Sequence, residues 1–352
     1  MSNFTHPILS FLLFLTAAIS QLQAQDPRFS QYYASPWNLN PAMTGVFNGR
    51  WRVVANYRDQ WSSILGNTPF RTYSAAFDTR AYVGRSDVAA FGVGVLHDEA
   101  GSARFSQNRV QIGGAYLKQL AGGPRSNEHY VSLGAQIGMG QNSLDRGKLW
   151  FSRQFNNTTN QPDLTAPNGE ANLNSSTKMF ADFNAGLLWY TLFGDEGFFY
   201  AGGAMHHINR PVISLIGDEK ETMYSRWSGQ IGGLFPLTET LSLLPGIVAM
   251  KQGPAFETDF GMNVRYSNHD LNELALRFGA WGRIGNQLNS GLISDAVTVV
   301  GMLELNNWIL GLSYDVTVSS LSLANNSRGA FEMSLSYVHP ISRRSKITCP
   351  AF

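Results

Sequence analysis

Alternating apolar and polar side chains dominate the chain from about residue 51 to residue 338. In the first such stretch, 51–61, one face carries Trp51, Val53, Ala55 and Tyr57. The opposite face carries Arg52, Asn56, Arg58 and Gln60, with Val54 as an exception. A repeat of two residues that gives one apolar face and one polar face is typical of half-buried β-strands. The pattern therefore predicts an all-β protein.

The same rule predicts about 14 strands (12–16). They are expected near residues 51–61, 69–79, 88–97, 104–119, 129–141, 179–191, 198–208, 226–236, 241–251, 256–267, 272–284, 296–305, 308–317 and 330–338. Many are about ten residues long, the length that a tilted strand needs to cross a bilayer. An even number of such strands favours an antiparallel transmembrane β-barrel over residues 51–338.

The connections between these strands differ at the two ends. Those after even-numbered strands are mostly short, as at 193–195, 236–239 and 306–307. Those after odd-numbered strands are mostly longer, with about 37 residues at 142–178, about 17 at 209–225, and about a dozen each near Asn286 and Ser322. Connections 80–87, 122–124 and 253–254 are exceptions. Short turns at one end and long loops at the other are typical of bacterial outer-membrane barrels.

The polar face of the strands is expected to line the lumen, because a charge on the lipid face near the bilayer centre costs about 2–4 kcal/mol. The predicted lumen charges are Arg52, Arg58, Arg71, Arg109, Asp182, Glu257, Asp259, Arg265, Arg277, Asp315 and Glu332. Glycines at 113, 134, 138, 186 and 232 leave room there for water, a ligand or a protein segment folded inward. Ion pairs that merely hold the barrel together are the favoured explanation of these charges.

Aromatic residues near the strand ends agree with a membrane barrel, because aromatic girdles mark both membrane interfaces. The expected girdle comprises Trp51, Trp61, Phe70, Trp189, Tyr190, Phe198, Tyr200, Trp227, Phe235, Tyr266 and Trp308.

Composition narrows the functional classes. Charged residues make up 14% of the 352 residues, against roughly 25% in a typical soluble domain. The net charge is +1 with no basic or acidic block, so nucleic acid is not an expected partner. The single cysteine, Cys349, excludes an internal disulfide and a four-cysteine zinc site.

The first residues read as a targeting segment. Residues 8–19 form an apolar run of roughly 12 residues, too short to span a membrane. With small residues near Ala24, the run predicts a secretory signal peptide over residues 1–24 and a mature chain that begins near Gln25. No Lys or Arg precedes the run, which is an imperfection of the pattern, and no cysteine follows it to carry a lipid anchor.

Residues 25–50 form a separate N-terminal segment, rich in aromatic and turn-forming residues. Its stripe at helical spacing comprises Phe29, Tyr32, Tyr33 and Trp37. Pro36 and Pro41 forbid one long helix, so two short helical turns with extended links are expected. Asn40 is the expected N-cap before Pro41, and Gly45 closes the turn. On pattern alone, this segment is an arm that packs on its own protein.

Catalytic spacing is missing from the sequence. It contains no Gly-x-Ser-x-Gly elbow, phosphate-binding loop or dinucleotide fingerprint. His206 and His207 are adjacent, so on a strand they would point to opposite faces and could not chelate one metal. The Asn-rich stretch 156–174 is expected to be a disordered loop. We therefore expect no enzyme activity, cofactor or metal.

The N-terminal segment resembles the signature of the PorP/SprF family, outer-membrane proteins of the type IX secretion system and its gliding machinery. The matched positions are Asp26, Pro27, Phe29, Ser30, Gln31, Tyr32, Asn40, Pro41, Ala42 and Gly45. Residues 51–52 and 56–61 resemble the first strand of the family, and residues 70–78 resemble the second. Cys349-Pro-Ala-Phe352 resembles a common C-terminal ending. The middle of the chain matches only as barrel-like strands. The tail 338–352 departs from the usual terminal aromatic strand residue, so either Tyr337 or Phe352 is the assembly signal.

The resemblance implies a non-enzymatic role in the outer membrane of a Gram-negative bacterium. It implies contact with outer-membrane lipid and with periplasmic secretion components, including a peptidoglycan-linked lipoprotein, and in some members with a large surface adhesin. We expect a short N-terminal periplasmic segment, 25–50, and a C-terminal periplasmic tail, 339–352, to grip these partners, while loop 142–178 faces outward. The candidate partner-binding residues are Phe29, Gln31, Tyr32, Trp37, Asn40, Pro41 and Gly45.

Three alternatives remain open at this stage. The first is a diffusion channel lined by the lumen arginines, and the second is a soluble secreted all-β binding protein. The third is an enzyme whose Ser, His and Asp side chains meet in the lumen. The partner, the state of the lumen, the oligomeric state and the role of Cys349 are not readable from the residues.

Overall fold

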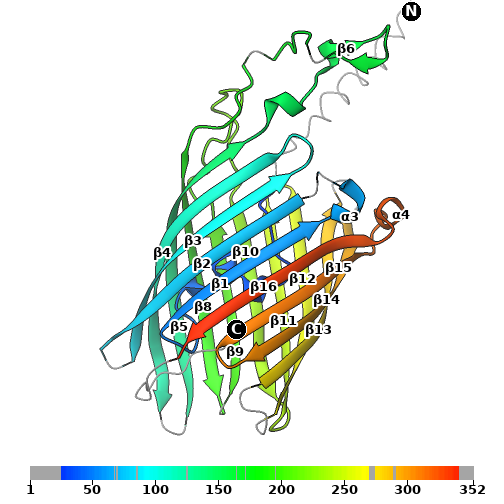
Figure 1. Ribbon diagram of the computed structural model, residues 1–352. Coiled ribbons are helices and arrows are strands. Elements are labelled where there is room, and N and C mark those ends of the chain that lie inside the picture. Colours follow the sequence, from blue (N-terminus) through cyan, green and yellow to red (C-terminus); the bar gives the residue numbers. More distant parts are fainter. Residues whose placement is uncertain are drawn as a thin grey trace, which may run out of the picture.

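The computed structural model describes residues 25–66, 68, 70–84, 86–123, 126–163, 165–170, 172–194, 196–268, 274–287 and 291–340. Within these residues, fourteen antiparallel strands close into one barrel (Figure 1). The predicted fold class and strand number are therefore confirmed. The predicted signal peptide, Cys349 and all but the first two residues of the predicted C-terminal tail lie outside the described residues.

The strands of the barrel follow one another around the wall in chain order. They are β1 (Trp51–Gln60), β2 (Phe70–Val83), β3 (Asp87–Ala100), β4 (Phe105–Gly123), β5 (Ser126–Ser143), β8 (Phe180–Phe193), β9 (Gly197–His206), β10 (Arg226–Pro236), β11 (Leu241–Gln252), β12 (Ala255–Asn268), β13 (Leu274–Gln287), β14 (Gly291–Leu305), β15 (Trp308–Thr317) and β16 (Arg328–His339). β1 closes the barrel on β16 in unbroken register, from Trp51 opposite His339 to Gln60 opposite Ala330. A closed barrel leaves no unpaired strand edge, as a membrane requires.

Short elements fill the connections and the N-terminal segment. They are η1 (Tyr32–Ala34), α2 (Pro36–Leu39), η2 (Pro41–Met43), α3 (Ser62–Leu65), η3 (Arg146–Lys148), η4 (Ser152–Gln154), the hairpin of β6 (Phe155–Asn156) and β7 (Gln161–Pro162), and α4 (Ser322–Asn325). The predicted short helical turns are thus present, broken before each proline. The stretch 156–174 contains hairpin residues and turns where the sequence suggested disorder.

The two ends of the barrel differ as predicted. At one end, here called the short-turn end, β2–β3, β8–β9, β10–β11 and β14–β15 are joined by tight turns. At the other, the long-loop end, connections 144–179 and 207–225 rise above the wall (Figure 1). The long loop expected near Asn286 is wrong. β13 and β14 both extend further than predicted, across a register shift between Arg283 and Ile284, and leave only residues 288–290 between them.

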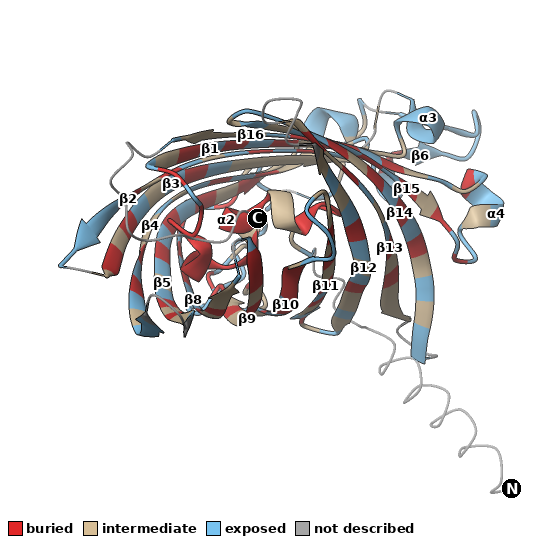
Figure 2. Cartoon of the chain, turned by 90° about the horizontal axis from the view of Figure 1, so that it is seen from below, coloured by how far each residue is buried: buried red, intermediate tan, exposed pale blue. Residues whose placement is uncertain are grey.

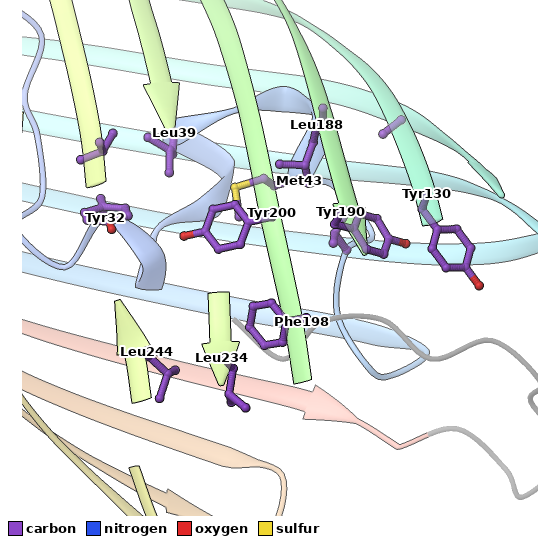
Figure 3. Packing of buried hydrophobic residues seen from close by; sticks show 14 of the residues in the cluster. Tyr32, Leu39, Met43, Tyr130, Leu188, Tyr190, Phe198, Tyr200, Leu234 and Leu244 are labelled. Atoms are coloured by element: carbon purple, nitrogen blue, oxygen red, sulfur yellow. The ribbon is translucent and has the colours of Figure 1, made fainter. Parts of the chain in front are cut away.

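The N-terminal segment lies inside the barrel. Figure 2, a view along the lumen, shows α2 enclosed by the ring of strands and coloured as buried. Every residue from Phe29 to Phe47 is buried or half-buried. Tyr32, Leu39 and Met43 of this segment share one apolar cluster with inward side chains of β8, β9, β10 and β11 (Figure 3). The lumen is therefore the hydrophobic core as well as the polar interior of this barrel.

The expected aromatic girdle needs one correction. Trp51, Trp227 and Trp308 belong to the outward face, as predicted. Tyr190, Phe198 and Tyr200 instead point inward and are at most 6% exposed, because they pack in the apolar cluster at the short-turn end. On a strand, inward and outward positions alternate, so aromatic content near a strand end does not by itself assign a face.

Candidate functional site

The candidate site is the lumen together with the segment that fills it. We call residues 25–50 the plug. The plug runs the length of the lumen, because its first residues bind side chains at the long-loop end and its last residues lead into β1 at the short-turn end. Four sets of contacts hold it between the long-loop end and the short-turn end.

The first contact lies at the long-loop end and centres on Asp26. Its carboxylate pairs with Arg109 of β4 at 2.7 Å, with His207 at 2.6 Å and with Arg226, the first residue of β10, at 3.2 Å. The other ring nitrogen of His207 lies 2.8 Å from the carboxylate of Asp182. All of these side chains are buried or nearly so. The start of the plug is therefore fixed beneath the long loops.

Electrostatics supports this pairing. Burial alone would raise the pKa of Asp26, but the positive charges of Arg109, His207 and Arg226 outweigh it and hold that pKa well below its usual value. Burial opposes the charged form of His207, yet the carboxylates of Asp26 and Asp182 raise its pKa above the ordinary value. Both members of the pair are favoured in their charged forms, so the contact is an ion pair.

The second contact is a network around Ser30. Its hydroxyl donates to Asp315 at 2.8 Å and accepts from Arg58 at 2.8 Å and from Arg283 at 2.5 Å, which uses its full capacity. Its backbone N–H donates to Glu332, which also pairs with Arg58. Buried charges of this kind are costly unless paired and hydrogen-bonded. The plug thus completes a charge network that the strands alone leave partly open.

Charges on neighbouring strands extend this network. Arg283 pairs with Asp259 at 2.8 Å and with Asp315 at 3.0 Å. Arg28 of the plug pairs with Glu257. Gln31 spans the adjacent strands, donating to the hydroxyl of Ser313 and accepting from the hydroxyl of Ser334, both at 2.9 Å. Backbone and side-chain groups of the plug are thus matched to the strand face opposite.

The third contact is at the middle of the plug. Asn40 is the N-cap of η2 and accepts the N–H of Ala42 at 2.9 Å, as the sequence predicts. Its amide donates to the backbone oxygens of Leu187 at 3.1 Å and Gly203 at 3.3 Å. These strand carbonyls are reachable because Gly186 presents no side chain: a Cβ there would overlap the Asn40 amide. The close approach of two backbones explains the glycine.

The indole ring of Trp37 packs directly against strand glycines as well. Methyl groups at Gly92 or Gly94 of β3 would overlap the indole ring, which is 5% exposed. Gly134 of β5 likewise leaves space for the carbonyl of Pro41. The room that lumen glycines were predicted to leave at 134 and 186 is therefore occupied by the plug.

The fourth contact closes the plug at the short-turn end. Gly45, with φ of 75°, turns the chain and donates its N–H to Asp78 at 2.8 Å. The guanidinium of Arg52 donates two hydrogen bonds of 2.8 and 3.0 Å to the same carboxylate and lies over the ring of Phe47. A positive φ at Gly45 confirms its predicted role as the turn residue. From here residues 48–50 lead directly into β1.

The structure brings the seven candidate partner-binding residues together in the lumen. Phe29, Gln31, Tyr32, Trp37, Asn40, Pro41 and Gly45 are all buried. Their neighbours are strands of their own barrel, as in the pattern-based expectation of an arm that packs on its own protein. The described part of the segment expected in the periplasm is thus placed within the barrel.

Most of the predicted lumen charges do face the lumen. Arg52, Arg58, Arg109, Asp182 and Asp259 are buried there in the contacts above. Glu257 binds Arg28 of the plug, while Arg265 of β12 and Arg277 of β13 share Glu304 of β14.

Two side chains depart from their predicted places. Arg71 lies on the outward face with Tyr73 and Phe77, because β2 begins at Phe70 and its buried positions are the even ones, Thr72 and Ser74. Its assignment to the lumen is corrected. His206 and His207 do not point to opposite faces, since the strand ends at His206 and a φ of 55° at His207 turns its ring inward.

Sequence reasoning missed several residues of the site. Arg283 lies six residues after Arg277 on the same face, but the strand was expected to end near it. Asp26 and Ser30 belong to the N-terminal signature, but the sequence assigned neither of them a contact. Apart from Arg58, which is 28 residues from Ser30, the partners described above lie more than 80 residues away, and no local signal in the sequence pairs them.

Neither a metal-binding cluster nor a membrane-spanning helix is found among the described residues. Among them, no group of three or more His, Cys, Asp or Glu side chains is placed to hold a metal ion. In the same part of the chain, no helix is long and apolar enough to cross a membrane.

Comparison with known proteins gives a family and several similar structures. The family model described as "Type IX secretion system membrane protein PorP/SprF" matches residues 21–337. No curated protein matches the sequence. Similar solved structures include the toluene transporter TbuX of Ralstonia pickettii (12% identity, 85% of this chain and 91% of that chain, TM-score 0.45), the P. putida toluene transporter TodX (12%, 86% and 93%, 0.41) and CdiB from Escherichia coli (10%, 81% and 63%, 0.46).

Proposed function

Because the chain belongs to the PorP/SprF family of type IX secretion system membrane proteins, we propose that it is a closed, plugged outer-membrane barrel that serves the secretion machinery as a structural, partner-binding component. The observation that supports this most is the plug, which occupies the lumen. It is ion-paired to the wall at the long-loop end through Asp26 and Arg28, and it is hydrogen-bonded to Asp78 at the short-turn end through Gly45. A barrel filled in this way is suited to assembly rather than to diffusion.

The proposed topology follows from the two unlike ends. In outer-membrane barrels the short turns face the periplasm and the long loops face outward. Residues 1–24 act as the signal peptide, and the exported chain folds with 51–338 as the barrel. The plug then begins near the cell surface and ends at the periplasmic mouth, where Asn48 and Arg50 are exposed.

The proposed partners are periplasmic components of the secretion system, including a peptidoglycan-linked lipoprotein, and a large surface adhesin for export or attachment. The short turns and residues 339–352 offer the periplasmic contacts. Loop 144–179 offers the surface contact, since it rises furthest above the wall (Figure 1). The plug contributes by fixing the shape of the periplasmic mouth through Gly45 and Phe47, which contact Asp78 and Arg52 of the wall.

Deletion of residues 26–45 tests this proposal. Co-purification of secretion partners should be lost while heat-modifiable migration in a detergent gel, the mark of a folded barrel, is kept. In planar bilayers, the full chain should show little current and the deletion variant a steady one. Large steady currents from the full chain would favour the diffusion-channel function instead, and an unaffected complex would count against the partner role of the plug.

A further inference from the structure

The outward wall of the barrel carries a hollow of about 770 Å³ over β1, β2, β3, β4 and β16. Its floor is low because Ala55 of β1 pairs directly with Ala75 of β2, and both are exposed. Its sides are larger residues, and the described lining includes Tyr57, Tyr73, Val95, Val110, Met333 and Leu335. This volume lies within the range of small-molecule sites, which are also mostly apolar.

The hollow lies between two aromatic rows. Toward the short-turn end, Trp51 contacts Phe77 and Tyr337, with ring centroids 6.1 and 5.2 Å apart. Toward the long-loop end, Tyr57 contacts Tyr73 at 5.1 Å. Aromatic rows of this kind mark the two membrane interfaces. The alanine floor therefore lies at the depth where acyl chains run.

A polar cluster caps the hollow at the long-loop end. The Tyr57 hydroxyl donates to Asp59 at 3.0 Å, and Asp59 pairs with Arg71 at 3.3 Å. The Arg71 side chain is 45% exposed and that of Asp59 only 13%, so the cation faces the bilayer surface. His97 contacts Tyr73 and bonds to Asn108 at 2.7 Å on the same side. Outward cations near an interface are recognition groups for anionic lipid headgroups.

We propose that this hollow is a binding site for one anionic lipid of the outer leaflet, whose acyl chain crosses Ala55 and Ala75 and whose phosphate-bearing headgroup lies at Arg71 and His97. The occupant is a lipid because the hollow opens on the face that a membrane barrel presents to acyl chains. The site is separate from the plug, so its occupancy does not depend on the proposed secretion role.

Native mass spectrometry of the full chain, extracted from vesicles of phosphatidylcholine with phosphatidylglycerol, tests the site. Wild type should retain about one phosphatidylglycerol per chain, with roughly a tenfold preference over phosphatidylcholine. The double variant Ala55→Leu/Ala75→Leu fills the floor and should lose about tenfold in lipid occupancy. Ala280→Leu is the matched control, since Ala280 is exposed on the outward face of β13 between Met262 and Val299.

The headgroup is tested separately. Arg71→Gln should remove the preference for phosphatidylglycerol while leaving one lipid bound, and inorganic phosphate should not displace the lipid. Equal lipid retention by wild type and the filled variant would overturn the proposal, because the lipid would then be ordinary surrounding lipid. A photo-crosslinking residue at Ala75 that captures a protein in cells instead of lipid would overturn it as well.

Discussion

Two glycines beneath the middle of the plug give a sharp test of its seating. Gly134 and Gly186 pair directly across β5 and β8 and form the floor under Asn40 and Pro41. A methyl group at Gly134 would overlap the Pro41 carbonyl, and one at Gly186 would overlap the Asn40 amide. The double variant Gly134→Ala/Gly186→Ala therefore forces either the plug or the wall to move.

The magnitudes indicate which of the two gives way. Overpacking a well-packed interior costs about 1–3 kcal/mol per site, so about 2–6 kcal/mol for both methyl groups. Residues 40–42 are held over this floor by three hydrogen bonds, two from Asn40 and one from Ser132 to Ala42. At about 0.5–1.5 kcal/mol net each, they supply about 1.5–4.5 kcal/mol. The strands belong to a closed hydrogen-bonded barrel, so we expect residues 40–42 to leave the floor.

Conductance in planar bilayers and urea unfolding in vesicles measure the outcome. The double variant should pass a larger current than wild type and unfold at lower urea, with heat-modifiable migration unchanged. Gly229→Ala is the control, because no heavy atom lies within 4 Å of a Cβ at that strand position. Currents and urea midpoints that match those of Gly229→Ala would refute the close fit between plug and wall.

Other substitutions probe the remaining contacts. Arg58→Ala leaves the buried carboxylates of Asp315 and Glu332 short of a partner, so it should lower the free energy of unfolding in urea by about 3–5 kcal/mol. The control Arg71→Ala, on the outward face, should change the urea midpoint far less. Equal effects of the two substitutions would contradict the lumen network. Trp37→Ala should lower the free energy of unfolding by about 3–5 kcal/mol, because it leaves a cavity over Gly92 and Gly94. A urea midpoint equal to that of wild type would show that the ring is not packed there. The pKa of His207 is raised, so its stabilising charge is complete below the unfolded value of about 6.5 and is lost as pH rises through the folded value. The melting temperature of wild type should therefore fall as pH rises above about 6.5, and His207→Gln should flatten this slope.

The barrel could be predicted from the sequence because period two is a strong, repeated signal. All fourteen strands were found, and errors fell at their ends, as at β13 and β14, where glycine and asparagine near 285–291 suggested a loop. Arg71 was assigned to the wrong face because it lies one residue inside the start of β2, where alternation gives few positions to fix the phase.

The plug could not be placed from the sequence. Its short helices, the Asn40 cap and the Gly45 turn are local and were predicted. Its position depends on partners such as Asp315 and Glu332, which lie about 300 residues away, and on glycines whose role appears only when Trp37 and Pro41 are set against them. A motif rich in aromatic residues reads equally as a docking surface or as a core, since both bury apolar area.

The direction of the plug is the central claim, and cysteine labelling on whole cells tests it most directly. Gln25 is exposed at the long-loop end and Asn48 at the short-turn end. In a Cys349→Ser background, Gln25→Cys should react with a small membrane-impermeant thiol reagent on intact cells. Asn48→Cys should react only after the outer membrane is permeabilised. The reverse pattern, with Asn48→Cys labelled from outside and Gln25→Cys only after permeabilisation, would contradict the account.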